Sequence, residues 1–120
     1  MKAYTDLEQS KKLAEILPIE SADMHYLFDI VFMELENIPT ITEENDHFIL
    51  FPKDIPCWSL SALFDILPDD TNIIKDKSDT ENEKYMCTVG VKGDIISTFG
   101  NNPVDVCYEM ILKLHELNLL

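Results

Sequence analysis

Cysteine and histidine side chains are the first candidates for chemistry in this chain. The sequence holds three residues of each type: Cys57, Cys87, Cys107, His25, His47 and His115. Structural zinc sites usually contain paired ligands roughly two to four residues apart, and no two of these six are that close. We therefore expect no metal site. The odd number of cysteines also predicts no disulfide framework, because such frameworks use an even count.

Cys57 is the cysteine whose location could activate a thiol. It comes just before an expected helix N-terminus, where the helix dipole lowers a thiol pKa. Its neighbours Pro56 and Trp58 are apolar, however, and this context is typical of a buried cysteine that packs as a small hydrophobe. Carboxylate pairs such as Glu43–Glu44 lack the apolar surroundings that raise the pKa of a general acid. We expect no catalytic residue, no cofactor and no enzymatic activity.

Net charge is the most unusual property of the composition. The chain has 120 residues and a formal net charge of −14, from 23 acidic and 9 basic residues. A protein surface with this excess of negative charge repels nucleic acids and anionic membranes. No segment has the roughly 18 apolar residues that span a bilayer, and the N-terminus does not resemble a signal peptide. The sequence predicts a soluble, cytoplasmic protein with one domain, residues 1–120.

Three helices are expected. The first begins at a capping box formed by Thr5 and Glu8 and ends before Pro18. The second is capped by Ser59 and carries one apolar stripe, composed of Leu60, Leu63, Phe64 and Leu67. The third runs from Pro103 to about Leu117, with Asn102 as its N-cap.

The strands are harder to predict from the sequence than the helices. Residues 24–35 fit a helical face and a strand equally well, and we favour a strand over Tyr26–Leu35 that pairs with His47–Phe51. Tyr85–Val91 and Ile95–Phe99 flank a Gly93 turn and predict a hairpin. Residues 69–84 are polar and predict a mobile connection. The predicted class is α+β, with helices packed on antiparallel strand pairs in the order α-β-β-α-β-β-α.

Four segments carry a resemblance to a known group. They are Leu13–Met24, Ile55–Leu60, Asn102–Asp105 and Met110–Leu117. On these segments, which cover about half of the chain, it resembles a group of short uncharacterised proteins of gut anaerobic bacteria and their phages or mobile elements. The group has no established activity, so the resemblance implies a genomic context and no mechanism.

Two functions remain as hypotheses. The first is a non-enzymatic protein-interaction module of an accessory or mobile genome, with Trp58, Val106 and Met110 as interface residues. Trp58 is more typical of a core tryptophan, packed beside Phe64, than of an interface anchor. The broad apolar face of the last helix predicts either a central helix or a homodimer contact. The alternative is an acidic inhibitor that mimics nucleic acid and blocks a host DNA-binding enzyme. Both hypotheses imply a protein partner, and neither implies binding to nucleic acid or to a membrane.

Overall fold

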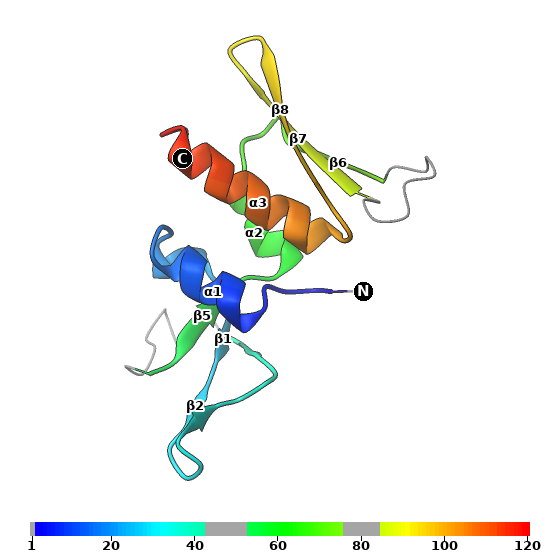
Figure 1. Ribbon diagram of the computed structural model, residues 1–120. Coiled ribbons are helices and arrows are strands. Elements are labelled where there is room, and N and C mark those ends of the chain that lie inside the picture. The colour runs from blue at the N-terminus through cyan, green and yellow to red at the C-terminus, as the bar shows by residue number, and fades with distance from the viewer. Residues whose placement is uncertain (1, 43–52, 76–84) are drawn as a thin grey trace. The chain divides into compact units, whose positions relative to one another are not determined.

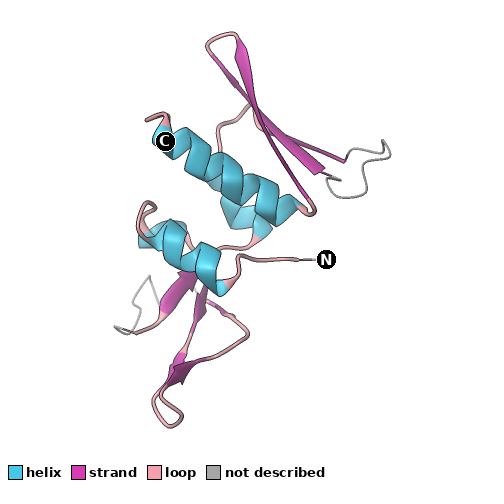
Figure 2. Cartoon of the chain, viewed as in Figure 1, coloured by secondary structure: helices cyan, strands magenta, loops and turns pink. Residues whose placement is uncertain are grey.

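The structure is a computed structural model that describes residues 2–42, 53–75 and 85–120. These residues form helices and antiparallel strands, so the predicted α+β class is confirmed (Figures 1 and 2). They divide into two compact units: residues 4–62, the N-terminal unit, and residues 1–3 with 63–120, the C-terminal unit. The boundary between the units falls within helix α2 (Leu60–Ile66).

The described residues of the N-terminal unit form helix α1, the start of α2 and two small sheets. Helix α1 (Leu7–Ala14) packs against strand β5 (Ile55–Cys57), and a 3₁₀ turn at Ile19–Ser21 follows the helix. Strand β1 (Met24–Tyr26) lies between β5 and β4 (Thr40–Ile41) in a three-stranded antiparallel sheet. This sheet brings together segments that are far apart in the sequence.

Helix α1 begins one residue later than the predicted capping box requires. The Asp6 carboxylate accepts the backbone N–H of Gln9 at 2.8 Å, and the Gln9 side chain accepts the Asp6 N–H at 3.1 Å. Thr5 is buried instead, with its hydroxyl 2.7 Å from that of Ser10 and accepting the Trp58 N–H at 3.1 Å. The prediction of Thr5 as the cap was wrong because this residue serves tertiary contacts.

The single strand predicted over Tyr26–Leu35 was also wrong. Strand β1 ends at Tyr26, and a separate hairpin follows, made of β2 (Phe28–Asp29) and β3 (Glu34–Leu35). Its predicted partner, His47–Phe51, lies outside the described residues.

A turn within this segment reverses the chain. The Asp29 carboxylate accepts the backbone N–H groups of Val31 at 2.8 Å and Phe32 at 3.2 Å. Met33 has a φ of 55°, a left-handed conformation that a non-glycine residue seldom adopts. Side-chain hydrogen bonding by an Asp is a recognised way to form a turn without glycine.

The C-terminal unit is a three-stranded antiparallel sheet covered by the last helix. The strand order is β6 (Asn72–Lys75), β7 (Tyr85–Val91) and β8 (Asp94–Gly100). Helix α3 (Pro103–Glu116) contacts β7 and β8 (Figure 1). Its buried face, which forms the core of the unit, comprises Val104, Val106, Cys107, Met110, Ile111 and Leu114.

The predicted hairpin and final helix are confirmed. Lys92 and Gly93 form the two-residue turn between β7 and β8, with φ values of 49° and 86°. The Asn102 side chain accepts the Asp105 N–H at 2.9 Å, and Pro103 occupies the first turn of α3. Both signals act locally, so they could be interpreted from the sequence.

Two other predictions need correction. The polar connection predicted over residues 69–84 contains a strand, because Asn72–Lys75 pairs with β7; residues 76–84 lie outside the described part. In α2, Ser59 caps the helix as predicted, accepting the Ala62 N–H at 3.1 Å. Phe64, expected in the buried stripe of that helix, is exposed.

Candidate interaction surface

The three predicted interface residues are all buried. Trp58, Val106 and Met110 have no exposed surface. The Trp58 indole N–H donates to the Ser21 hydroxyl at 3.0 Å, so its polar atom is satisfied inside the N-terminal unit. These side chains belong to the cores of the two units and present no surface to a partner.

Cys57 also lies inside the N-terminal unit. Its thiol is 3.4 Å from the Thr5 carbonyl oxygen, which also accepts the Tyr26 hydroxyl at 2.8 Å. Burial raises the pKa of Cys57, although hydrogen bonds from Thr5 and Ser10 oppose that shift. Burial likewise raises the pKa of Tyr26. The uncharged forms are therefore favoured, and this environment does not activate the thiol.

The other titratable candidates are dispersed. Cys87 and Cys107 are buried free thiols of the C-terminal unit. A hydrogen bond from Cys107 lowers the pKa of Cys87, and the same contact, together with burial, raises that of Cys107. His25 is buried beside Thr42, with 2.7 Å between the ring Nδ1 and the hydroxyl oxygen. Within the described ranges, no three His, Cys, Asp or Glu side chains are grouped so that they could hold a metal ion.

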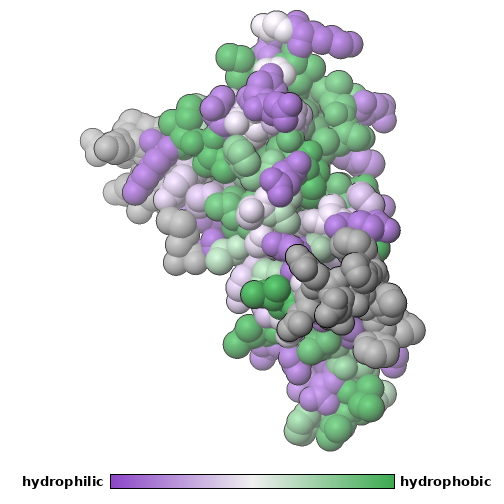
Figure 3. Space-filling view, turned by 180° about the vertical axis from the view of Figure 1, so that it is seen from behind, coloured by the Kyte–Doolittle hydropathy of each residue, from purple (hydrophilic) through white to green (hydrophobic). Residues whose placement is uncertain are grey.

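The most distinctive surface feature is the tip of the β2–β3 hairpin. Four consecutive apolar side chains there, Ile30, Val31, Phe32 and Met33, are each between 65% and 79% exposed. Hydrophobic side chains are visible at that end of the N-terminal unit (Figure 3). Single exposed apolar residues are ordinary on a protein surface, whereas large contiguous apolar patches are typical of interaction sites. We call residues 30–33 the apolar tip.

The base of the hairpin is anchored to a distant part of the chain. Buried Asp54 accepts the Phe28 N–H at 2.9 Å, and the Glu36 N–H donates to the Leu27 carbonyl at 2.8 Å. The Lys53 ammonium lies 4.7 Å from the centroid of the Phe28 ring, within cation–π range. The short strands of the hairpin are therefore supported by contacts beyond their own ladder.

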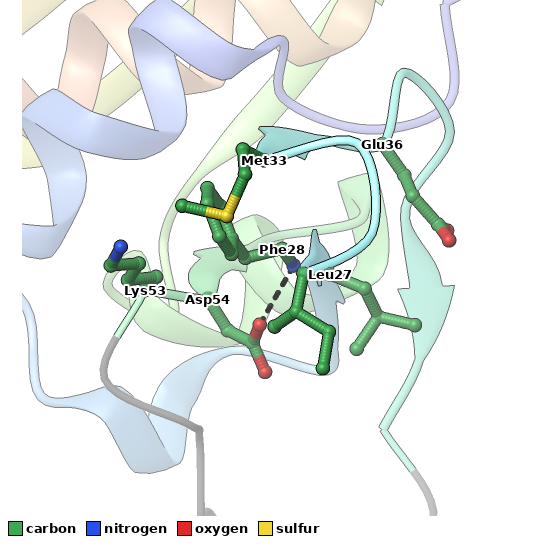
Figure 4. A pocket seen from close by; sticks show the side chains of 7 residues that line it. Leu27, Phe28, Met33, Glu36, Lys53 and Asp54 are labelled. Carbon is green, nitrogen blue, oxygen red and sulfur yellow. Dashed lines mark hydrogen bonds between the residues drawn. The ribbon is translucent and has the colours of Figure 1, made fainter.

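A hollow of about 690 Å³ lies beside this base. Its lining is mostly apolar and consists of Leu27, Phe28, Ile30, Met33, Glu36, Lys53 and Asp54. The Phe28 and Met33 side chains lie close together on one side of it, and the dashed line marks the bond from the Phe28 N–H to Asp54 (Figure 4). The hollow is continuous with the apolar tip, because Ile30 and Met33 belong to both.

Carboxylates flank the apolar residues of the hairpin. Asp29 precedes the tip, and Glu34 and Glu36 follow it, with both glutamates exposed. An apolar centre with a charged rim is the usual anatomy of a protein interface.

The sequence contained a signal for this surface. Ile30–Met33 is an apolar run directly after an Asp, and an Asp can form a turn through its own carboxylate. Because the run also has the composition of a strand, the sequence analysis assigned it to a strand instead.

No described helix is long and apolar enough to cross a membrane. Comparison of the chain with protein-family models, curated proteins and solved structures finds no match.

Proposed function

We propose that the protein is a non-enzymatic protein-interaction module that binds its partner through the apolar tip of the β2–β3 hairpin. The exposure of Ile30–Met33 is the observation that carries this proposal. Exposed apolar area is costly in water, and covering the four side chains would recover about 25 cal/mol for each Å² buried. The resemblance of the sequence to proteins of phages and mobile elements suggests an accessory genome as its origin.

The partner is a protein with an apolar pocket and a basic rim. Charge complementarity supports this choice, because three carboxylates flank the tip and the chain carries a net charge of −14. An anionic membrane would also accept apolar side chains, but it would repel this chain. The nucleic-acid mimic is the alternative proposal, and it rests on charge alone. Four exposed apolar residues would not contribute to a surface that imitates phosphate groups.

Affinity capture with matched variants tests the proposal. Immobilised parent protein, Phe32→Ser and Leu117→Ser would each be incubated with native lysate, and the captured protein would then be purified and titrated against all three. Phe32 and Leu117 are both exposed apolar residues, on different units. An aromatic anchor contributes about 2 kcal/mol or more to binding, so Phe32→Ser should weaken binding at least about 30-fold, and Leu117→Ser should not.

Two results would contradict the proposal. If Phe32→Ser binds the purified partner as tightly as the parent does, the tip is not the binding surface. If duplex DNA displaces the protein from its partner in proportion to DNA concentration, the nucleic-acid mimic becomes the better explanation. Thermal melting of the Phe32→Ser variant should match that of the parent, because the side chain is exposed.

A further inference from the structure

The exposed edge of strand β8 is a second surface, in the C-terminal unit. The sheet order is β6-β7-β8, so within the described part of the chain β8 has a neighbour on one side only. An edge strand presents unpaired N–H and C=O groups that can pair with another extended chain. The turn and register show which backbone groups face outward.

The two-residue turn makes Val91 and Asp94 the closing hydrogen-bonded pair of the hairpin. In an antiparallel ladder, hydrogen-bonded and non-hydrogen-bonded pairs alternate, so Ser97 lies in a non-hydrogen-bonded pair with Thr88. The N–H and C=O groups of Ser97, and of Ile95 and Phe99 by the same alternation, therefore point away from β7. The Lys113 ammonium agrees with this assignment, because it donates to the Ser97 carbonyl from the outer side at 3.4 Å.

Helix α3 forms the second wall of a groove along this edge. A hollow of about 570 Å³ is lined by strand residues 97–99 and by one stripe of α3, composed of Glu109, Leu112, Lys113 and Glu116. The helix and the strand are in contact (Figure 1). A strand edge beside a helix is a site where an extended peptide can add as a further strand. Glu109 and Glu116 are exposed, and each places a carboxylate along the groove.

We infer that this groove binds an extended, basic peptide segment by strand addition to β8. The edge supplies backbone hydrogen bonds at Ile95, Ser97 and Phe99, and the glutamates of α3 favour Lys or Arg at alternate peptide positions. A second copy of this chain is the less suitable occupant, because two chains of net charge −14 repel each other. Lys113 covers the Ser97 carbonyl in the free protein, and its exposed side chain must move aside when the peptide binds.

A designed peptide of alternating Lys and Val provides the probe. Binding of the fluorescein-labelled heptapeptide Lys-Val-Lys-Val-Lys-Val-Lys would be measured by fluorescence anisotropy. Two control peptides have the same length: one with Glu in place of Lys, and one N-methylated at every backbone amide so that neither edge of the peptide can pair. The basic peptide should bind, and both controls should bind at least about tenfold more weakly, because each loses an interaction the groove requires.

Variants of the protein locate the site. Ser97→Pro removes one outward N–H without removing a bond to β7, and edge strands tolerate proline there. It should weaken binding at least about tenfold. Glu109→Lys should weaken it about fivefold, and Glu15→Lys, with the same change in net charge on an exposed residue of the other unit, should not. Lys113→Ala should strengthen binding about threefold, because it frees the Ser97 carbonyl and removes a like charge.

Three results would overturn the inference. They are equal binding of the N-methylated and unmodified peptides, equal weakening by Glu15→Lys and Glu109→Lys, and unchanged binding by a Ser97→Pro variant that melts like the parent. If Ser97→Pro does not fold, the N-methylated peptide and the Glu109→Lys and Lys113→Ala pair decide the question. Phe32→Ser should leave peptide binding unchanged, so failure here is distinguishable from failure of the apolar tip proposal.

Discussion

Two hairpins whose turns the structure describes both reverse the chain within a few residues, but they use different residues to do so. The β7–β8 turn uses Lys92 and Gly93, both with positive φ, at a polar tip. The β2–β3 turn uses the Asp29 carboxylate and a left-handed Met33, and its tip is apolar. The first has a glycine at its second turn position, which such turns favour. Both turns place one non-glycine residue, Lys92 or Met33, at positive φ. Only the second exposes a run of hydrophobic side chains, which is the pattern expected where function, rather than stability, determines the residues.

The apolar residues of the two regions also differ in what they contact. In the C-terminal unit, apolar side chains of β7 face the core of the unit, where Cys87 and Val89 are buried. In the β2–β3 hairpin, the apolar residues of the turn face solvent. Substitutions that introduce a charge should therefore destabilise the C-terminal unit when they replace a buried side chain, and should be tolerated in the β2–β3 turn.

Leu114→Asp and Phe32→Asp should show the largest difference. Leu114 is fully buried in α3, so the aspartate places an unpaired charge in the core and removes packing. The expected loss exceeds about 4 kcal/mol, out of the roughly 5 to 15 kcal/mol typical of a domain. Phe32→Asp should change the free energy of unfolding by less than about 0.5 kcal/mol, because the side chain is exposed. Chemical denaturation followed by circular dichroism measures both.

Met110→Asp extends this test to a residue that the sequence analysis assigned to an interface. Met110 is as buried as Leu114, so we expect it to lose a similar amount of stability. A folded, monomeric Met110→Asp protein beside a dimeric parent would instead restore the homodimer predicted for the last helix.

Asp29→Ala should have the next largest effect, confined to the β2–β3 hairpin. The variant loses the acceptor for the Val31 and Phe32 N–H groups, at a local cost of about 1.5 kcal/mol. Because the hairpin is short, the expected result is local opening rather than global unfolding. Amide hydrogen exchange at Val31 and Phe32 should accelerate by about tenfold, while exchange in β7 stays unchanged. Unchanged exchange at Val31 and Phe32 would show that the turn is not held by Asp29, and equal acceleration in both hairpins would show that the opening is global rather than local.

The contrast between the hairpins also explains what could be predicted from sequence. The Gly93 turn and the Asn102–Pro103 cap act through neighbouring residues, so their signals are local. The β2–β3 hairpin depends on a contact between Phe28 and Asp54, which are far apart in the chain. Strand β6 was missed because its short apolar pair, Ile73–Ile74, lies in a polar segment and is stabilised by pairing with β7.

The candidate surfaces were harder to predict than the fold. Apolar residues of α3 such as Val106 and Met110 look the same in sequence whether they form a core or an interface, and only burial distinguishes the two. The apolar tip has the composition of a buried strand, and its exposure follows from the turn at Asp29. The β8 edge has no residue signature, because its outward groups belong to the backbone.

Gly93→Ala tests the polar turn and should have a smaller effect than Asp29→Ala. Gly93 has a φ of 86°, where an alanine Cβ is strained, although beyond its two chain neighbours no residue has an atom within 4 Å of the position a Cβ would take. The cost therefore comes from backbone strain alone, and we expect a loss of about 1 kcal/mol. Thermal melting measures it, and Lys92→Gly should change stability in the opposite direction or leave it unchanged. A Gly93→Ala variant more stable than the parent would mean that the turn differs from the one described.

Met33→Gly is the corresponding change in the apolar turn, and its effect on stability should be the smallest. Glycine adopts a φ of 55° without the strain that methionine carries, but it also increases the freedom of the unfolded chain. The two effects nearly cancel, so the free energy of unfolding should rise by at most about 0.5 kcal/mol. The same substitution removes a side chain shared by the apolar tip and the hollow, so partner binding should fall by about tenfold. A variant that keeps or gains stability while losing binding would show that the left-handed methionine is retained for interaction. If Met33→Gly instead destabilises the protein and leaves binding intact, the apolar side chains of this turn contribute to the fold, and the contrast between the two hairpins no longer holds.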